Sequence, residues 1–292
     1  MSTDTTQPEV SPIRFAEDWE RWHRGHEERR ADRHGFLAVT GLHWLAETPI
    51  EIEGIPGRWS ATDAGGPAVE LAEGERLSRD GAELTGDVAL GPLEERTGVD
   101  LDHGDVRIEV ARRGGRYIVR PRDPKASFLD VYKGTEAYPP LAKWRREARF
   151  VPHEQPVPTT VGAAAPGIEH VYEAPGVLEF TAPDGTPATL TAFNGYAPGT
   201  LLVLFTDETS GVTTYAANRS IAVPAPDAEG RTVLDFTRAV NLPCAYTDHA
   251  TCPLPPAENR LPFAVEAGEL SPSERLTAEG IETVEAPAPV VS

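Results

Sequence analysis

The first regular pattern along the chain is that of an amphipathic helix near the N-terminus. Residues 15–34 contain good helix formers and no proline, and Phe15, Trp19 and Trp22 recur at helical spacing among acids and arginines. A glycine follows as a C-terminal stop, and the apolar run at residues 36–40 is typical of a strand. We therefore expect one N-terminal helix whose aromatic side chains pack across the rest of the fold.

After this helix, short alternations of apolar and polar residues replace the helical spacing. Gly, Pro or Asp interrupts them every eight to twelve residues, which is the pattern of an all-β sandwich or barrel. The predicted fold class is therefore mainly β, with antiparallel sheets in a sandwich or barrel-like arrangement and one N-terminal helix. The expected hairpins span residues 108–119, 177–193 and 201–216, and a further strand is expected at residues 233–236.

Composition divides the chain into four segments. Residues 1–11 and 276–292 are expected to be disordered tails, because ordering them would bury too little apolar surface to offset the lost entropy. Between them we expect an N-terminal helix plus a β region at residues 12–150 and a C-terminal β region at residues 151–275. The boundary lies in a proline-rich stretch that begins near Pro152. This stretch is either a crossover between two β layers or a linker between two small domains, and the sequence leaves both open.

The charge balance excludes two classes of partner. The chain has 27 Lys and Arg against 46 Asp and Glu, a formal net charge of −19. Such a surface repels phosphate backbones and anionic lipid headgroups, so we expect neither nucleic acid nor membrane as a partner. No stretch approaches the ~20 apolar residues of a membrane span, and the first residues lack a basic start and an apolar run. The expected location is therefore the cytoplasm, where Cys244 and Cys252 should be thiols rather than a disulfide.

Standard catalytic motifs are absent from the sequence. It contains no G-x-G-x-x-G, G-x-x-x-x-G-K-[ST], H-E-x-x-H, G-x-S-x-G or C-x-x-C. These absences argue against a nucleotide-binding, hydride-transfer or serine-hydrolase site. No cofactor is expected.

The most unusual segment lies near the C-terminus and spans residues 235–269. Four prolines between positions 253 and 262 fix the backbone and remove amide donors around Glu258, Asn259 and Arg260. Three strongly hydrogen-bonding side chains would then project from a stiff loop, as a binding or catalytic site requires. The alternative is structural: the acid pairs with an arginine, the amide satisfies the loop, and the segment clamps the sheet.

This segment resembles a family of bacterial and archaeal proteins known as domain of unknown function 1684. The hallmark of that family is a D-F-N-R-A-Y-N-P-P-C-A-Y block that runs into T-C-P-L-P-P-x-E-N-R-L and then A-G-E. Residues 37–45, 144–150 and 205–219 are also similar to the family, so the resemblance covers about residues 15–270. It implies kinship rather than an activity, and it implies that the matching blocks form one site or one core. The matching residues are Asp235 to Ala239, Asn241, Pro243 to Tyr246, Thr251 to Pro256, Glu258 to Leu261 and Ala267 to Glu269.

Three arginines and three carboxylates lie within the family-like blocks. If they converge, they either neutralise one another as a buried ion network or leave a guanidinium pair free to hold an anionic ligand such as a carboxylate or phosphate. Asp235 interrupts an apolar run, so it either faces water or needs a partner inside the fold. The arginines are Arg219, Arg238 and Arg260, and the carboxylates are Asp207, Asp235 and Glu258.

Histidines supply the side chains of this sequence whose ordinary pKa lies near neutral pH. His43, beside Trp44, has a near-neutral pKa that suits acid–base chemistry if a carboxylate orients the ring; the alternative is a structural histidine. His23 and His26 lie three residues apart on the predicted helix and could share a face that holds a metal. The acids and arginines around them favour a solvated face instead.

A zinc site is the remaining alternative for metal chemistry. Cys244, His249 and Cys252 could supply three ligands, but their spacing fits no standard zinc site. Two buried thiols that pack as small hydrophobic groups, with a loop histidine between them, explain the same residues. We therefore expect no bound metal.

These observations favour a protein that binds a small anionic molecule in a cavity closed by the proline-stiffened segment. The alternative is a metal-independent acid–base enzyme, a hydrolase or isomerase, in which Glu258 shuttles a proton with His43 while arginines hold an anion. The sequence names no substrate and no oligomeric state. The residues expected at the site are Glu258, His43 and Asp235 for catalysis, and Arg219, Arg238, Asn259, Arg260, Trp44 and Tyr246 for ligand binding.

Overall fold

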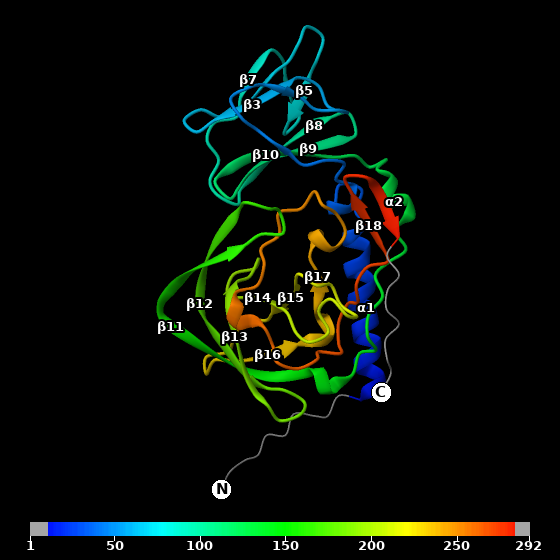
Figure 1. Cartoon of the computed structure of the whole chain (residues 1–292), viewed down its shortest axis with the longest axis vertical. Helices are drawn as coiled ribbons and strands as arrows, with labels where there is room; N and C mark the ends of the chain where they lie inside the picture. The colour runs from blue at the N-terminus through cyan, green and yellow to red at the C-terminus, as the bar shows by residue number, and fades with distance from the viewer. Residues whose placement is uncertain (1–10, 284–292) are drawn as a thin grey trace.

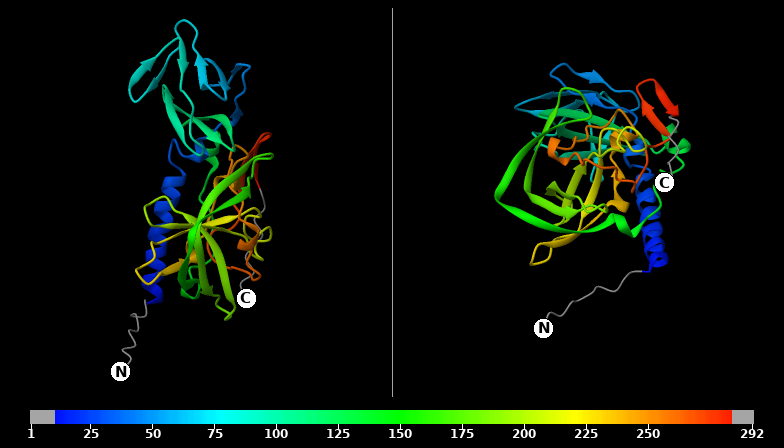
Figure 2. Two further views of the ribbon diagram at one scale, coloured as in Figure 1. Left: turned by 90° about the vertical axis from the view of Figure 1, so that its left-hand side faces the viewer. Right: turned by 60° about the horizontal axis from the view of Figure 1, so that its bottom comes forward.

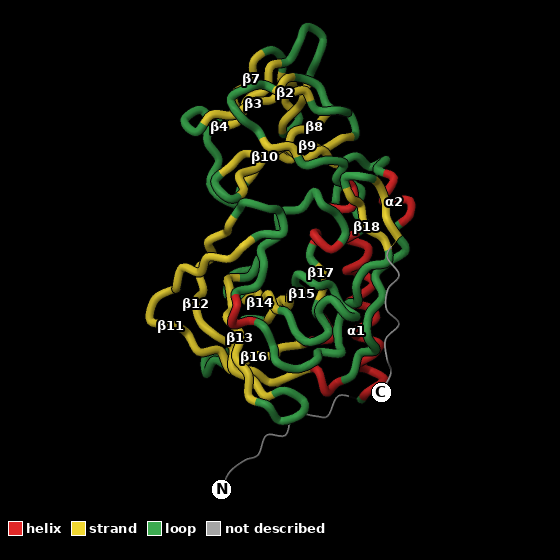
Figure 3. Tube along the Cα trace, viewed as in Figure 1, coloured by secondary structure: helices red, strands yellow, loops and turns green. Residues whose placement is uncertain are grey.

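Antiparallel strands make up most of the structure, and one long helix lies beside them (Figures 1 and 3). The computed structural model describes residues 11–283. The prediction of a mainly β fold with an N-terminal helix is confirmed. Residues 1–10 and 284–292, which make up most of the two predicted tails, lie outside the described residues.

The N-terminal helix, α1, runs from Pro12 to Arg30. It begins earlier than predicted because proline suits the first turn of a helix, where its missing N–H would have no partner. It also ends earlier, because the N–H of Gly35 donates to the carbonyl of Asp32 at 2.7 Å and closes a separate turn. Among the described residues, no helix combines the length and the apolar content needed to cross a membrane.

The strand predicted at residues 36–40 is not present. Phe36–Ala38 form a short 3-10 helix, η1, and only Val39 makes a bridge, to Arg122. Every residue from 37 to 39 is buried. The apolar run therefore reflects burial on all sides rather than the pairing of a strand.

The first ten strands form a sandwich of two antiparallel sheets around one hydrophobic core. Trp59 of one sheet and Ile108 of the other are both 0% exposed within that core. The predicted hairpin at residues 108–119 is confirmed, and Gly114 and Gly115 turn it with positive φ. The larger sheet has the order β1 (His43–Trp44), β10 (Arg116–Arg122), β9 (Val106–Arg113), β8 (Gly98–His103), β5 (Leu77–Arg79) and β6 (Ala82–Leu84), and the smaller has the order β2 (Ile50–Glu51), β3 (Arg58–Thr62), β4 (Gly66–Glu70) and β7 (Asp87–Ala89).

The longer strands that follow form a seven-stranded antiparallel sheet that curls around the C-terminal segment (Figure 2). Phe236, Leu261 and Val265 of that segment pack inside the curled sheet in a second hydrophobic core. The predicted hairpin at residues 177–193 is confirmed. The strand predicted at residues 233–236 is also confirmed as β16, which forms one edge of this sheet. The order is β16 (Arg231–Asp235), β11 (Arg145–Gly162), β12 (Glu169–Thr181), β13 (Pro187–Asn194), β14 (Leu201–Phe205), β15 (Arg219–Val223) and β17 (Val240–Asn241).

The predicted hairpin at residues 201–216 is wrong in its second arm. β14 pairs with β15, and residues 212–216 belong to the loop between them. The carboxylate of Asp207 accepts hydrogen bonds from the backbone N–H and the hydroxyl of Thr209, at 2.8 and 2.6 Å, and this turns the chain away from β14. Arg219 at the start of β15 then donates to Asp207 at 2.8 Å. The connection from β14 to β15 is therefore a loop held by side-chain hydrogen bonds and not a tight hairpin turn.

The predicted boundary after residue 150 falls inside β11, which continues through the proline-rich stretch. The pairing of β11 with β12 changes register between Pro152 and Val157. Such an irregularity accommodates prolines because they cannot donate to the ladder. The prolines therefore modify a strand instead of linking two regions.

A short hairpin occupies residues 274–283, most of which were predicted to be part of a tail. Its first strand is held to the preceding loop, because the N–H of Leu276 donates to the carbonyl of Tyr246 at 2.7 Å and Arg275 donates to Asp248 at 2.6 Å. Contacts to the fold order a segment whose own composition is poor in apolar residues. The remaining short elements are β18 (Glu274–Thr277), β19 (Gly280–Thr283), α2 (Ser127–Val131), η2 (Ala142–Trp144), η3 (Phe236–Arg238), η4 (Pro243–Ala245) and η5 (Ala257–Asn259).

Candidate functional site

The proline-stiffened loop packs inside the curled sheet, where Leu261 belongs to the hydrophobic core. Asn259 is fully buried and makes three hydrogen bonds to the backbones of Thr191 and Leu204. Glu258 is exposed and accepts one hydrogen bond from the Thr191 hydroxyl at 3.3 Å, and Arg260 is also exposed. The predicted acid, amide and guanidinium are therefore not directed at one ligand. Two surface hollows of the molecule are lined by other segments, one by residues 195–202 and 222–224 and the other by residues 51–58 and 70–75.

The predicted arginines are also engaged within the protein. Arg219 is 1% exposed; it donates to Asp207 and to the carbonyl oxygens of Val265 and Ala267, so it belongs to a buried ion network. Arg238 is exposed and lies over the ring of Trp22, with 5.3 Å from its guanidinium carbon to the ring centroid. The first of the two alternatives for these charges, mutual neutralisation, describes Arg219.

Asp235 ends β16 and caps the 3-10 helix that follows it. Its Oδ1 accepts from the N–H and the hydroxyl of Thr237, at 3.1 and 2.6 Å, and its Oδ2 lies 3.7 Å from Nε of Arg238. The carboxylate is half-buried and its hydrogen-bonding positions face the local backbone. Asp235 therefore acts on the fold by fixing the turn that carries Phe236 into the core.

His43 lies in β1, on the sandwich, and not beside Glu258. It is half-buried, and burial lowers its pKa. The neighbouring Trp44 lies under the guanidinium of Arg116, 4.3 Å from the ring centroid. In the described part of the chain, no carboxylate forms a hydrogen bond or ion pair with His43. The predicted proton shuttle of Glu258 and His43 is not assembled.

Cys244 and Cys252 are free, buried thiols that pack with Ala250. The N–H of Cys244 donates to Sγ of Cys252 at 3.3 Å, and a hydrogen bond from the Cys252 thiol lowers the pKa of Cys244. His249 between them is half-buried, and burial lowers its pKa. Within residues 11–283, the three side chains do not converge at the separation of metal ligands.

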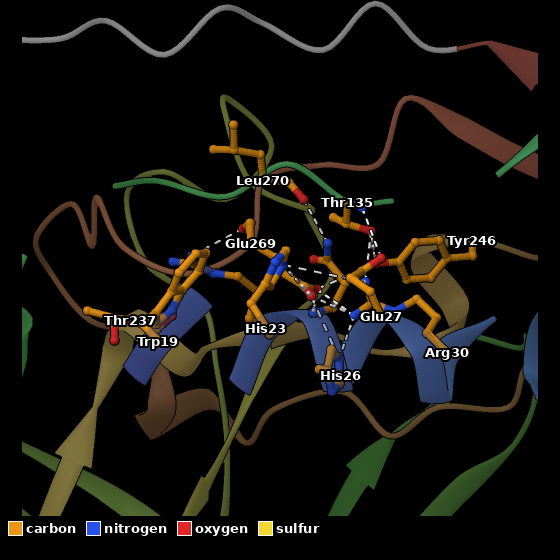
Figure 4. A network of polar contacts seen from close by, with 12 residues as sticks. Trp19, His23, His26, Glu27, Arg30, Thr135, Thr237, Tyr246, Glu269 and Leu270 are labelled. Atoms are coloured by element: carbon orange, nitrogen blue, oxygen red, sulfur yellow. Dashed lines mark hydrogen bonds and ion pairs between the residues drawn. The ribbon is translucent and has the colours of Figure 1, made fainter. Parts of the chain in front are cut away.

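A polar site lies on the inward face of α1, at the two histidines for which the sequence favours a solvated face (Figure 4). His23 and His26 do not face solvent: both are half-buried and point with Glu27 and Arg30 toward Glu269. The prediction of a solvated histidine face is wrong because this helical face packs against the C-terminal segment. The stripe of inward residues continues the aromatic spacing that positions the helix.

The centre of this site is an ion pair between Arg30 and Glu269, which are each 1% exposed at the side chain. Nη2 of Arg30 donates to Oε1 and Oε2 of Glu269 at 2.6 and 2.8 Å. The same nitrogen lies 2.7 Å from Nε2 of His26, and Nη1 of Arg30 contacts Oε1 of Glu27. One guanidinium thus joins two carboxylates and an imidazole.

The outer oxygens of both carboxylates are held by the fold. Oε2 of Glu269 accepts from the backbone N–H of Asn241 at 2.7 Å, and Oε2 of Glu27 accepts from the hydroxyl of Tyr132 and the N–H of Thr135. These bonds come from two separate segments of the chain, residues 132–135 and residue 241. They fix the orientation of each carboxyl group.

Tyr246, predicted to bind ligand, belongs to this site through its ring and its hydroxyl group. Its ring is 0% exposed and lies 4.8 Å from the guanidinium carbon of Arg30, and its hydroxyl lies 2.7 Å from the Thr135 hydroxyl and 3.4 Å from Glu269. Burial raises its pKa well above the ordinary value. The side chain is neutral and serves to orient its neighbours.

Burial also sets the charge of the titratable groups here. It raises the pKa of Glu269 to about 7, against the opposing effect of Arg30. It lowers the pKa of His23, and together with the charge of Arg30 it lowers the pKa of His26 to about 3. Both imidazoles are therefore neutral at pH 7 and present lone pairs rather than positive charge.

A second polar cluster lies on one face of β9 and β10. Glu109 is 6% exposed and accepts hydrogen bonds from Arg113 at 3.0 Å and from Arg120 at 2.6 and 3.1 Å, and it also contacts Arg122. Burial alone would raise the pKa of Glu109, but the charges and hydrogen bonds of Arg120 and Arg122 outweigh it and lower this pKa to about 2. Burial, and then the nearby Arg120, lowers the pKa of Arg113. Positive charge exceeds negative charge in this cluster.

Comparisons with known proteins give kinship without an activity. Curated proteins give no match. The solution NMR structure of an uncharacterized protein from Haloarcula marismortui is 33% identical over 49% of this chain and 80% of that chain, with a TM-score of 0.41. Residues 130–270, which carry Tyr132, Thr135, Asn241, Tyr246 and Glu269, match the family described as "Protein of unknown function (DUF1684)". The chain belongs to this family, the one that its C-terminal blocks resemble.

Proposed function

We propose that this protein binds a small anionic molecule at the arginine cluster of β9 and β10. The observation that carries the proposal is an imbalance of charge: Arg113, Arg120 and Arg122 share the single carboxylate of Glu109. Two positive charges are left without a partner. The three guanidinium side chains are only 17%, 13% and 24% exposed, so water screens them less than it screens surface arginines.

Neighbouring groups do not remove this excess. Glu95 lies close by, but Arg112 accompanies it, with 3.9 Å between Nε and the carboxylate. The oxygens of Glu95 also accept from the N–H groups of Gly114 and Gly115, at 2.7 and 2.9 Å. Four guanidinium groups and two carboxylates again differ by two charges. In a chain with a net charge of −19, such a local concentration of positive charge is a specific feature.

The donors that remain suit an anionic group that carries two or more oxygen atoms. Arg120 uses Nε and Nη2 on Glu109, and no acceptor in the described chain bonds its Nη1. Arg113 directs its Nη1 to backbone carbonyls and keeps its Nε without an acceptor there. Guanidinium groups bind carboxylates and phosphates through paired N–H donors. The proposed ligand is therefore a small molecule with a carboxylate or a phosphate group.

Titration calorimetry on the full chain tests this proposal, with inorganic phosphate and succinate as probes at constant ionic strength. We expect at least one probe to bind with a Kd below about 1 mM. Arg120→Gln should weaken that binding at least about tenfold, because it removes one of the excess charges while Glu109 keeps two partners. Arg231→Gln is the matched control, since Arg231 is 71% exposed and pairs with Asp227 and Glu229.

Two results would refute the assignment. One is the absence of binding by both probes at concentrations well above 1 mM, roughly tenfold higher. The other is equal weakening by Arg120→Gln and Arg231→Gln, which would reduce the effect to net charge. Circular dichroism of each variant establishes that the fold is retained.

A further inference from the structure

Three metal-type donor atoms converge between α1 and the C-terminal segment. Nε2 of His23 lies 3.8 Å from Oε1 of Glu27 and 4.0 Å from Oε1 of Glu269, and all three atoms lie within 4.8 Å of one another. Ligands of one zinc-sized ion at ~2.1 Å are roughly 3.4 Å apart. Small side-chain rotations would bring these three atoms to that spacing.

The imidazole of His23 has a buried nitrogen, Nε2, without a hydrogen-bond partner in the described part of the chain. The ring is stacked on Trp19, with centroids 4.7 Å apart and an interplanar angle of 10°. Trp19 is itself fixed, because its Nε1 donates to the carbonyl of Thr237 at 2.6 Å. A buried polar atom held in this way costs free energy unless something binds it.

The two carboxylates are oriented as metal ligands usually are. Their Oε2 atoms are bonded to the fold, to Asn241 and Tyr246 for Glu269 and to Tyr132 and Thr135 for Glu27, so their Oε1 atoms face His23. Hydrogen bonds to the outer oxygen fix a ligating carboxylate and tune its affinity. The described fold thus supplies both the ligands and the groups that position them.

Arg30 limits the charge of the site without filling it. It donates to Oε1 of both carboxylates, and each such oxygen has a second lone pair. When both carboxylates are ionised, they and the one guanidinium leave a single negative charge for a dication. We expect the affinity to be modest for this reason, and the nitrogen ligand favours zinc-like ions over magnesium or calcium.

We propose that His23, Glu27 and Glu269 form a binding site for one divalent transition-metal ion, on a part of the fold that does not include the arginine cluster. No ligand atom of the site comes from β9 or β10. The α1 helix supplies two of the ligands from adjacent turns, as residues four apart on one helical face do. The third comes from the segment that α1 packs against. The ion would thereby join the helix to the C-terminal segment.

Titration of the full chain, first freed of metal with a chelator, tests the site with Co²⁺ as the probe. Visible absorption and calorimetry should report one equivalent, with a Kd of about 10 μM. His23→Ala should weaken Co²⁺ binding at least about tenfold, since it removes a ligand and leaves the Arg30 and Glu269 pair in place. His103→Ala is the matched control, because His103 is exposed and belongs to no cluster.

A second measurement on unaltered protein keeps the test independent of the folding of the variants. Crystals soaked with Zn²⁺ should show an anomalous peak within bonding distance of Nε2 of His23. A peak elsewhere, no binding of Co²⁺, or equal weakening by the two histidine variants would overturn the proposal. Arg120→Gln should leave Co²⁺ binding unchanged, so failure of this site and failure of the anion site are separable.

Discussion

The side-chain amide of Asn259 and the backbone of Thr191 form a closed pair of hydrogen bonds. The N–H of Thr191 donates to Oδ1 at 2.7 Å, and Nδ2 donates back to the carbonyl of Thr191 at 2.9 Å. Nδ2 also donates to the carbonyl of Leu204 at 2.8 Å. β13 and β14 pair directly only at their ends, Phe193 with Leu202 and Asn194 with Leu201, so the amide continues the sheet where the strands separate.

Asn259→Ala should therefore destabilise the protein strongly. It leaves three buried backbone groups without partners, and we expect a loss of about 3 kcal/mol in the free energy of unfolding measured with urea. Asn194→Ala is the control, because Asn194 is exposed at the end of β13, and it should cost less than about 0.5 kcal/mol. Similar losses in the two variants would contradict the role given to this amide.

Gly268 is required both for its backbone conformation and for its size. Its φ is +76°, and a Cβ there would lie 2.6 Å from the carbonyl oxygen of Ala239 and 2.9 Å from that of Phe236. Gly268→Ala should lower the melting temperature much more than Gly185→Ala, where φ is +92° and nothing lies within 4 Å. Equal shifts in thermal denaturation would mean that the close approach of the two backbones costs nothing.

Arg219 is predicted to matter for stability rather than for ligand binding. Arg219→Met leaves the buried carboxylate of Asp207 without its guanidinium, which should cost about 3 to 5 kcal/mol in urea unfolding. Arg231→Met removes an exposed ion pair with Asp227 and should leave the unfolding free energy almost unchanged. If Arg219→Met instead retains stability and loses affinity for phosphate or succinate, the buried ion network has been misassigned.

The low pKa of Glu109 predicts a specific loss of stability in acid. The folded pKa is about 2 against an ordinary value of 4.5, so this carboxylate stabilises the fold above pH 4.5, and the contribution disappears as the pH falls toward 2. The difference in unfolding free energy between wild type and Glu109→Gln should reach about 3 kcal/mol near neutral pH and shrink between about pH 4.5 and pH 2. Glu83→Gln provides the comparison, since Glu83 is 59% exposed, and its difference should stay near zero. A difference for Glu109 that does not change with pH would be inconsistent with the ion cluster.

Local patterns were sufficient for the elements whose partners are close in sequence. The hairpins at residues 108–119 and 177–193 follow from alternating segments around Gly-containing turns. The hairpin at residues 201–216 does not, because Asp207 bonds Thr209 and Arg219 and redirects the chain. A pattern of apolar positions does not show that a carboxylate will accept hydrogen bonds from its own loop and so change the path of the chain.

The helical spacing in the sequence indicates which residues of α1 face inward, but the charged and polar character of the residues at the polar site favours exposure to solvent. The spacing that identifies the aromatic face also includes the four residues of the site. What decides their burial is Glu269, which is 239 positions from Arg30 and whose location no local rule supplies. The two series of residues four apart are Phe15, Trp19, His23 and Glu27, and then Trp22, His26 and Arg30.

The arginine cluster illustrates the same limit on a strand. Glu109 and Arg113 lie at positions that alternate with the core residues Ile108 and Val110, so they belong to the face of the strand that is turned away from that core. They do face away from the core of the sandwich, yet they are largely buried, because Arg120 and Arg122 of the next strand gather around the same carboxylate. Register between strands, and not alternation within one strand, determines the cluster.

The contacts of α1 also bear on when this helix can dock as the chain is synthesised. During synthesis the helix leaves the ribosome well before Thr237 and Glu269, the residues that receive Trp19 and Arg30. Until those residues emerge, the two tryptophans and the polar stripe have no surface to pack against, and a nascent chain of this length exposes them to chaperones or to other chains. During synthesis, docking of the N-terminal helix therefore waits for the C-terminal segment, and the inward face of the helix stays uncovered until that segment has emerged.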